Sequence, residues 1–311
     1  MNNEIHYIKR KQLDVAKYDT CIKLAANSRI YAYSWYLDIV ADAWDVLVLG
    51  DYLAVMPLPK RKKYFIDYVY TPFWVAELGV FFRKELNSDL YQEVIIAFIN
   101  DMKKRFSQID ILLNFSNKNM NISYPVKLSQ RLDISKEYEV IFKNYRKGRK
   151  SDLSKARRNN LQIKWNDDTK NLIVLHKENV GNKLNSFKDR DYAVLEQLIE
   201  EAKIRKIGKI ISVFDINNQL LASTFILKNK SVITALVTAS DLKFRKNGAT
   251  SFLYNGVIKE YSNKDYIFDF AGSSVTSIAE FFKSFGAKDV KKFHVSKYHC
   301  LYYFAKKLKT V

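Results

Sequence analysis

The chain has 311 residues, of which 48% are hydrophobic and 14% aromatic. Those fractions exclude an intrinsically disordered chain, and the length favours two domains over one. The formal net charge of +19 favours a partner that carries negative charge.

Positive charge and proline are both distributed unevenly along the chain. Residues 1–130 hold 17 Lys and Arg against 14 Asp and Glu, a net charge of +3, whereas residues 131–311 hold 35 against 19, a net charge of +16. All 4 prolines precede residue 126. We therefore predict an N-terminal domain of residues 1–130 and a C-terminal domain of residues 131–311. The basic half is expected to bind an anion such as a nucleotide cofactor, tRNA or an anionic lipid, unless its charge serves only solubility.

The cysteines and the first residues indicate a compartment. Cys21 and Cys300 lie far apart, which argues against a disulfide framework and for a reducing environment. The opening residues, MNNEIHYIKRKQLD, lack the apolar core of a signal peptide. No apolar run reaches the roughly 20 residues that span a bilayer. We predict a cytoplasmic protein without a transmembrane segment, and the sequence leaves its oligomeric state open.

The first half predicts a mixed α/β unit in the order helix, hairpin, helix, strand. Residues 44–60, WDVLVLGDYLAVMPLPK, predict two strands around a Gly50-Asp51 turn. Residues 89–106 carry apolar side chains at helical spacing. These apolar residues are Leu90, Val94, Ile95, Phe98 and Met102. Residues 108–116, QIDILLNFS, predict the next strand.

The second half follows the same rough scheme with more elements. Residues 136–165 predict two helical pieces and a strand, and residues 191–206 predict a further helix. Three strands follow in residues 208–240, and a loop then enters a helix in residues 241–263. The remaining elements are a strand in 265–273, a helix in 275–286, and a strand and a basic helix in 291–309. Two copies of one α/β fold would explain this similarity of the halves.

The sequence lacks the common motifs of metal, nucleotide and hydrolytic chemistry. His294, His299 and Cys300 lie close together, but their spacing fits no standard metal site, so we expect no metal. A P-loop, a G-x-S-x-G elbow, a dinucleotide-binding glycine fingerprint and a kinase signature are also absent. These absences disfavour hydride transfer, P-loop phosphoryl transfer and serine hydrolysis.

One loop combines glycine, cations and the start of a helix. Residues 245–250 read Arg-Lys-Asn-Gly-Ala-Thr and follow a strand that ends near Ser240. Gly248 lets the backbone approach a ligand, and a helix start presents free N–H groups with a positive dipole end. The loop therefore predicts a site for a phosphate or pyrophosphate. A plain connection with solvated charges is the alternative.

The same loop resembles the pyrophosphate loop of GNAT acyltransferases. In the pattern Q/R-x-x-G-x-G/A, Arg245 matches the first residue and Gly248 the first glycine, whereas Thr250 departs from the final small residue. The resemblance implies a donor site composed of Arg245, Lys246, Asn247, Gly248, Ala249 and Thr250.

A longer resemblance covers most of the chain. The segments NYRKGRKSDLSKARRNNLQI and FDFAGS with EFFKSFGA resemble the opening and the closing signature of the second half of Fem-type aminoacyltransferases and their acetyltransferase relatives. The segments SRIYAYSWYLDIV and TPFWVAELGVF are similar to the first half of these double-GNAT proteins. The resemblance implies an α/β (α+β) fold of two tandem GNAT-like domains, each with a mixed, mostly antiparallel sheet flanked by helices.

The resemblance implies an N-acyltransferase that forms no covalent enzyme intermediate. A small or nucleotide-linked acceptor amine would attack the carbonyl of an acyl-CoA donor directly, and proximity would supply much of the rate. One alternative is a Fem-type transferase that uses aminoacyl-tRNA and acts on a cell-wall precursor. Another is a catalytically idle double-GNAT scaffold that binds an anionic partner.

The resemblance also assigns roles to basic residues outside the loop. Lys283 takes the position of the lysine at the acyl-transfer centre, where a cation stabilises the oxyanion. Arg146, Arg149 and Lys150 lie near the place where an arginine contacts the diphosphate of an acceptor. Lys150 is the closest match, and lysine cannot reproduce the bidentate geometry of arginine.

Two further candidates come from their positions beside these segments. Asp269 would orient or deprotonate the attacking amine, or it would brace the loop that follows its strand. Tyr254 would protonate a leaving thiolate, or it would belong to the core.

Overall fold

The computed structural model describes residues 4–63, 66–118, 124–181 and 187–299. The chain divides into two compact units, of which the N-terminal unit comprises Met1–Lys127 and Lys291–Val311 and the C-terminal unit Leu128–Val290. The domain boundary between residues 130 and 131 stays a prediction. The basic helix that we predict at the end of 291–309 lies outside the described residues.

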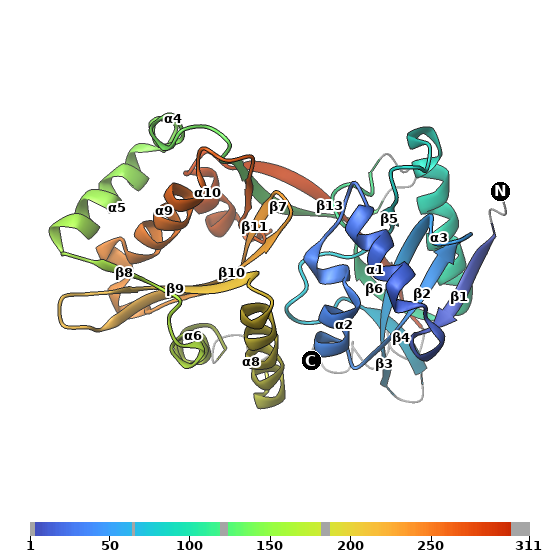
Figure 1. Cartoon of the computed structure of the whole chain (residues 1–311). Coiled ribbons are helices and arrows are strands. Elements are labelled where there is room, and N and C mark those ends of the chain that lie inside the picture. The colour runs from blue at the N-terminus through green and yellow to red at the C-terminus, as the bar shows by residue number, and fades with distance from the viewer. Residues whose placement is uncertain (1–3, 64–65, 119–123, 182–186, 300–311) are drawn as a thin grey trace. The chain divides into compact units, whose positions relative to one another are not determined.

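The N-terminal unit is built on a mixed, mostly antiparallel sheet (Figure 1). Its strands follow the order β1 (Ile5–Lys9), β2 (Ala43–Leu49), β3 (Ala54–Lys63), β4 (Ile66–Tyr70), β6 (Gln108–Leu112) and β13 (Lys288–Lys297), with β5 (Phe81–Phe82) paired to β3. β4 and β6 run parallel. β2 and β3 pair antiparallel up to Leu49↔Ala54, so the hairpin predicted around Gly50-Asp51 is confirmed.

Helices complete this unit and follow the apolar spacing of the sequence. They are α1 (Val15–Leu24), α2 (Ser34–Val40) and α3 (Tyr91–Arg105). α3 buries Ile95, Phe98 and Met102, as their helical spacing predicts. Leu90 is 39% exposed because it lies in a 3₁₀ turn, Ser88–Leu90, that precedes the helix. The predicted helix is therefore confirmed with a later start.

The C-terminal unit also has a mixed, mostly antiparallel sheet. Its strands follow the order β7 (Val126–Asp133), β12 (Ile267–Asp269), β11 (Val232–Ser240), β10 (Leu220–Asn229), β9 (Gly208–Phe214) and β8 (Gln162–Trp165). Its helices are α4 (Tyr138–Lys143), α5 (Lys147–Arg158), α6 (Thr169–His176), α8 (Asp189–Ile204), α9 (Ala249–Tyr261) and α10 (Thr276–Lys283). Figure 1 shows α5 and α9 on one face of this sheet and α6 and α8 on the other.

β11 loses one neighbour along its length. β12 pairs with it in parallel over three residues and ends at Thr234↔Asp269. β10 stays paired with β11 as far as Ser240. Residues 235–240 of β11 therefore have no strand at their second edge among the described residues. This unpaired stretch ends at Ser240, where the segment that leads to α9 begins.

Aromatic side chains fill the space between the end of β12, α9 and α10. Tyr254 of α9 has the rings of five phenylalanines around it, with centroids 5.3–6.1 Å away. These are Phe268, Phe270, Phe281, Phe282 and Phe285. Phe225, Phe268 and Phe285 are fully buried. This cluster fixes how α10 and the loop before it lie against α9, because closely packed rings leave few alternative arrangements.

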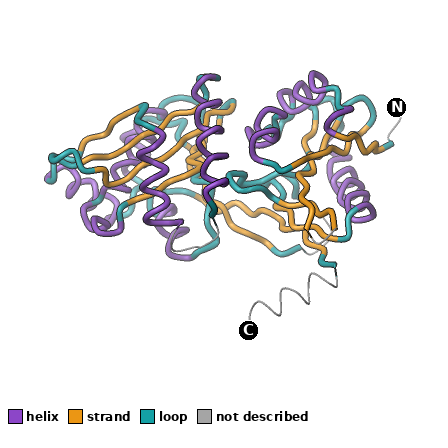
Figure 2. The backbone as a smooth tube through the Cα atoms, turned by 90° about the horizontal axis from the view of Figure 1, so that it is seen from below, coloured by secondary structure: helices purple, strands orange, loops and turns teal. Residues whose placement is uncertain are grey.

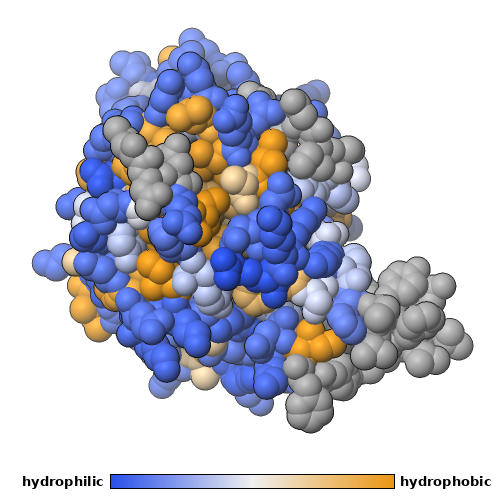
Figure 3. Space-filling model, turned by 90° about the vertical axis from the view of Figure 1, so that its right-hand side faces the viewer, coloured by the Kyte–Doolittle hydropathy of each residue, from blue (hydrophilic) through white to orange (hydrophobic). Residues whose placement is uncertain are grey.

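The predicted fold class is confirmed in both units. Figure 2 shows strands and helices combined within each of them. The face drawn in Figure 3 is mainly hydrophilic, with hydrophobic residues in smaller areas between hydrophilic ones. Within the described part of the chain, no helix has the length and apolar character that a membrane span requires.

Candidate active site

The start of α9 has the backbone geometry of a tight entry into a helix. Gly248, the residue before α9, has φ +86°, in the left-handed region that glycine adopts at little cost. A 3₁₀ segment, Leu242–Asn247, precedes it. The Asn247 side chain accepts a hydrogen bond from the N–H of Ala249 at 3.0 Å, which satisfies one donor of the first turn.

Gly248 lies against the backbone of α5. A Cβ atom added at Gly248 would overlap the carbonyl oxygen of Asp152. The glycine is therefore required by the packing of α5 on the start of α9, in addition to its positive φ. This contact brings two predicted sites together, because Arg149 also belongs to α5.

Replacing Gly248 by alanine is expected to lower the free energy of unfolding by about 2–4 kcal/mol, through left-handed backbone strain and overpacking against Asp152. Gly148 on α5 is the matched control, since a Cβ there has no atom within 4 Å. Gly148→Ala should raise stability by about 0.5–1 kcal/mol, as expected in a helix. Urea denaturation measures both, and equal effects would refute the packing argument.

Arg149 contacts the first turn of α9 directly. Its Nη1 donates to Ser251 Oγ at 2.7 Å and lies 2.9 Å from Asp152 Oδ2. Ser251 Oγ also donates to Asp152 Oδ2 at 2.8 Å. The guanidinium carbon lies 4.5 Å from the ring centre of Phe281, and Nε is buried with no hydrogen-bond partner among the residues that the structure describes. The predicted acceptor-binding Arg149 thus lies beside the predicted donor loop.

The first turn of α9 also has backbone N–H groups that are not engaged in hydrogen bonds among the described residues. Within the described part of the chain, the N–H groups of Thr250 and Ser251 have no hydrogen-bond acceptor. Together with Arg149 and the helix dipole they form a place that favours negative charge. The Asp152 carboxylate already supplies one negative charge there and would compete with an incoming anion. Lys246 is exposed on the loop, and the side chain of Arg245 lies outside the described part.

The other two basic candidates lie elsewhere. Arg146 pairs with Glu280 of α10 at 2.8 Å. Lys150 Nζ donates to the carbonyl of Lys143 in α4 at 2.9 Å and lies over the ring of Phe142. Arg146 and Lys150 thus engage α10 and α4, whereas Arg149 engages α9.

Lys283 ends α10 and is held by two carboxylates. Its Nζ lies 2.5 Å from Glu280 Oε1 and 3.5 Å from Asp289 Oδ2. The hydrogen bond to Glu280 raises the pKa of Lys283 above its ordinary value, so the side chain is a cation at neutral pH. Its side chain is 29% exposed, which leaves the charge within reach of a ligand.

Asp269 closes β12 and is buried. It pairs with the guanidinium of Arg131 on β7 and accepts the N–H of Ala271 at 2.9 Å. Ala271 and Gly272 then have φ +55° and +69°, two successive left-handed residues. Of the two roles raised by the sequence, this geometry favours the brace for the loop, and the role of Asp269 stays a prediction.

Tyr254 lies inside the aromatic cluster and is 3% exposed. Burial raises its pKa to about 12, and a hydrogen bond with Thr238 acts in the opposite direction. The phenol is therefore protonated at neutral pH and can act as a donor, in contact with β11 near its open edge. Its catalytic role stays a prediction.

Sequence reasoning missed a buried glutamine that links these elements. Gln130 of β7 accepts the N–H of Ser273 at 3.0 Å and donates to Asp289 Oδ1 at 2.9 Å. It thereby joins the loop after Asp269 to the carboxylate beside Lys283. A polar strand, VKLSQRLD, gives no sign that its glutamine is fully buried. Asp152 and Ser251 were also missed, because nothing in the sequence around them indicates that they bond to each other.

No group of three or more potential metal ligands occurs among the described residues. His294 lies on β13 and bonds to Asp110 at 2.6 Å. Cys300, the third member of the predicted histidine–cysteine group, lies outside the described residues.

No protein-family model matches the chain, and no curated protein matches its sequence. Solved structures do match. FemX superposes with a TM-score of 0.63 at 12% identity over 94% of this chain and 96% of its own. A C-terminal domain assigned to a lysylphosphatidylglycerol synthetase from Agrobacterium fabrum gives 0.56 at 10% identity over 96% of each chain. A tandem GNAT protein from the clavulanic acid biosynthesis pathway gives 0.51 at 11% identity over 95% and 99%.

Identities of 10–12% over nearly whole chains show a common fold. The folds of these neighbours are those of GNAT-like acyltransferases and Fem-type transferases. The resemblance seen in the sequence is thus confirmed: the chain has the double-GNAT fold of Fem-type and tandem GNAT proteins.

Proposed function

We propose that the chain is an N-acyltransferase that moves an acyl group from an acyl-CoA to an amine. The observation that carries the proposal is the meeting of Arg149 with the first turn of α9, beside the open edge of β11. The free N–H groups and the cation suit the phosphate end of an acyl-CoA donor. The strand edge without a neighbour suits the amide-containing chain of the same donor.

The residues present fit such a donor in its charge. The N–H groups of Thr250 and Ser251, with Arg149, would hold its diphosphate. Residues 235–240 of β11 offer backbone groups to its amides. The bound donor would supply an activated thioester carbonyl.

The chain's own residues would then act on the amine and the carbonyl. The amine nitrogen attacks the carbonyl carbon, the carbon–sulfur bond breaks, and the thiolate leaves with a proton. Lys283 would stabilise the negative oxygen of the intermediate. Tyr254 would give the proton to the thiolate, and the proton that the amine loses would pass to water. Because the acyl-CoA pool is cytoplasmic, we place this reaction in the cytoplasm.

A Fem-type use of aminoacyl-tRNA is the second candidate, favoured by the exposed basic side chains of α5. Lys147, Arg157 and Arg158 are exposed on this helix, and no ion pair engages them among the described residues. Such a row of cations suits a phosphate backbone and would give binding that weakens steeply with salt.

Thermal unfolding with acetyl-CoA, with longer acyl-CoAs and with aminoacyl-tRNA tests the proposal. At a donor concentration of about 100 times Kd, the melting temperature should rise by about 5–10 °C. Arg149→Gln should lose most of that rise, whereas Arg190→Gln on α8 should keep it. Asp152→Asn should enlarge it, because the competing charge is removed. A rise with aminoacyl-tRNA alone would move the donor to the second candidate. If the melting temperature rose with none of these donors, the catalytically idle scaffold would be the alternative that stays.

A further inference from the structure

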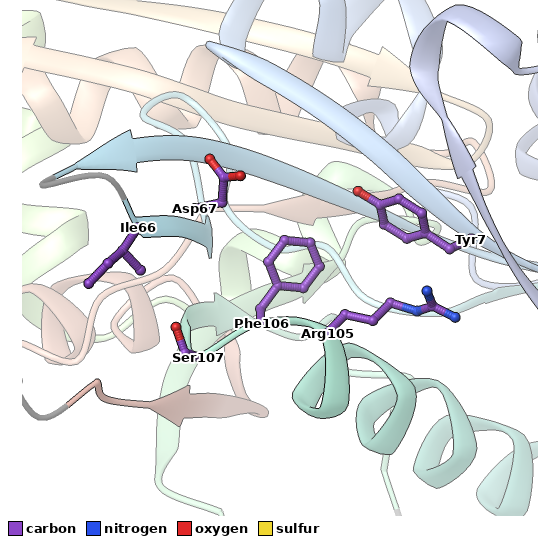
Figure 4. Close-up of a pocket in the computed structure, with 6 residues that line it drawn as sticks. All are labelled: Tyr7, Ile66, Asp67, Arg105, Phe106 and Ser107. Carbon is purple, nitrogen blue, oxygen red and sulfur yellow. The ribbon is translucent and has the colours of Figure 1, made fainter.

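The N-terminal unit contains a pocket that the acyl-transfer proposal does not use. Its volume is about 570 Å³, within the range of small-molecule sites. Figure 4 shows that its lining comes from β1, β4 and the end of α3. The lining residues are Tyr7, Ile66, Asp67, Arg105, Phe106 and Ser107.

Aromatic and aliphatic groups form the wall of this pocket. The rings of Tyr7 and Phe106 have their centres 6.3 Å apart and are tilted by 53°. Figure 4 shows Phe106 in the middle, with Asp67 and the Tyr7 hydroxyl on one side of it and Ser107 on the other. Ile66 extends the apolar surface beyond Asp67. A branched or aromatic side chain of a ligand has apolar contacts there.

The pocket has one carboxylate and one guanidinium with bonding capacity left. Asp67 is exposed, and none of the described residues forms a hydrogen bond or ion pair with its carboxylate. Arg105 uses Nε and Nη2 for Asp101, at 2.6 and 3.2 Å, which leaves Nη1. The guanidinium carbon lies 5.1 Å from the ring centre of Tyr7. Opposite charges thus line one small cavity.

The carboxylate of Asp45, which contacts Tyr7 of the pocket, is already neutralised. Asp45 accepts from the Tyr7 hydroxyl, from Lys60 Nζ and from the N–H of Arg10. Burial, followed by the hydrogen bond to Asp45, raises the pKa of Tyr7, so this ring stays a neutral phenol. Tyr7 is held in place by Asp45 and contributes a fixed polar edge to the pocket. Among the lining residues, the charged groups are the Asp67 carboxylate and the Arg105 guanidinium, of which Nη1 is left for a ligand.

We propose that this pocket binds a free α-amino acid with an apolar side chain. Asp67 takes the ammonium group, Arg105 Nη1 takes the carboxylate, and Phe106 with Ile66 contacts the side chain. A zwitterion engages both the Asp67 carboxylate and the remaining Nη1 of Arg105, whereas an ion of one sign engages only one of these two groups. The proposal is independent of the acyl-transfer site, because every lining residue belongs to the N-terminal unit.

Isothermal titration of the full chain with three probes tests this site. L-leucine carries both charges, N-acetyl-L-leucine only the carboxylate and L-leucinamide only the ammonium. L-leucine should bind saturably and at least about tenfold more tightly than either derivative, since each lost charged hydrogen bond is worth about that factor. Each variant should remove one preference. Asp67→Asn should equalise L-leucine and N-acetyl-L-leucine, and Arg105→Gln should equalise L-leucine and L-leucinamide.

Two control variants keep the test specific. Asp51→Asn removes an exposed acid and Arg83→Gln a partly exposed arginine of the same unit, and both side chains are paired with other residues. Both should leave the three affinities unchanged. Three results would each overturn the proposal: no saturable binding of L-leucine below about 10 mM, equal affinity for the three probes, or unchanged preferences in Asp67→Asn and Arg105→Gln.

Discussion

Replacing Lys283 by methionine is expected to lower kcat/KM for acyl transfer by about 100- to 1000-fold, the usual loss for one oxyanion-stabilising group. The side chain is exposed enough to reach a ligand, and its ion pairs with Glu280 and Asp289 keep it charged. Stability should change little, because a pair on the surface contributes little to it. Activity and stability should therefore separate in this variant.

The measurement is thiol release from acetyl-CoA in the presence of a panel of amines. Lys170→Met on α6 is the matched control, since Lys170 is exposed and lies on the opposite face of the same sheet. It should keep the full rate, and Lys283→Arg should recover part of it. If Lys283→Met transferred acyl groups as fast as the wild type, the assignment of the oxyanion role to this residue would be wrong.

Replacing Arg131 by methionine should lower the free energy of unfolding by about 3–5 kcal/mol, because the carboxylate of Asp269 would be left buried without its cation. Both side chains are more than nine-tenths buried. Guanidinium denaturation at neutral pH measures this loss.

A second change separates the pair from its surroundings. In the double variant Arg131→Met/Asp269→Leu no charge stays buried, and most of the lost stability should return. The part that does not return measures the bond from the N–H of Ala271, which leucine cannot accept. A cost below about 1 kcal/mol for Arg131→Met would contradict the brace and restore the case for Asp269 as a base.

The local elements of this fold were predictable to different degrees. The β2–β3 hairpin and the buried face of α3 follow from turn residues and apolar spacing, which are properties of neighbouring residues. Gly248 was singled out because glycine lets the backbone approach a ligand, whereas the structure shows a left-handed backbone and a close approach to the backbone of Asp152. The pairing of β13 with β6 joins residues more than 180 positions apart, and no local pattern can show it.

The candidate site was predictable only where a motif carried it. The resemblance pointed to Arg149 and to the start of α9 separately, but the bond between Arg149 and Ser251 depends on the packing of α5 on α9. Gln130 belongs to no motif, and its partners Ser273 and Asp289 lie far away in the sequence. Asp152 lies within the quoted segment, but its bond with Ser251 of α9 depends on how the two helices pack. Tertiary packing, which a single sequence does not reveal, decides these contacts.

The N-terminal unit contains both Met1–Lys127 and Lys291–Val311, so the C-terminal unit is an insertion in its chain. β6 receives its second neighbour only when β13 has been synthesised. During translation, residues 128–290 leave the ribosome while β6 still has an open hydrogen-bonding edge, which is a place for mispairing. The C-terminal unit can therefore reach its folded state before the N-terminal unit does. Early termination of synthesis would disrupt the folding of the N-terminal unit most, because that unit needs the last residues of the chain.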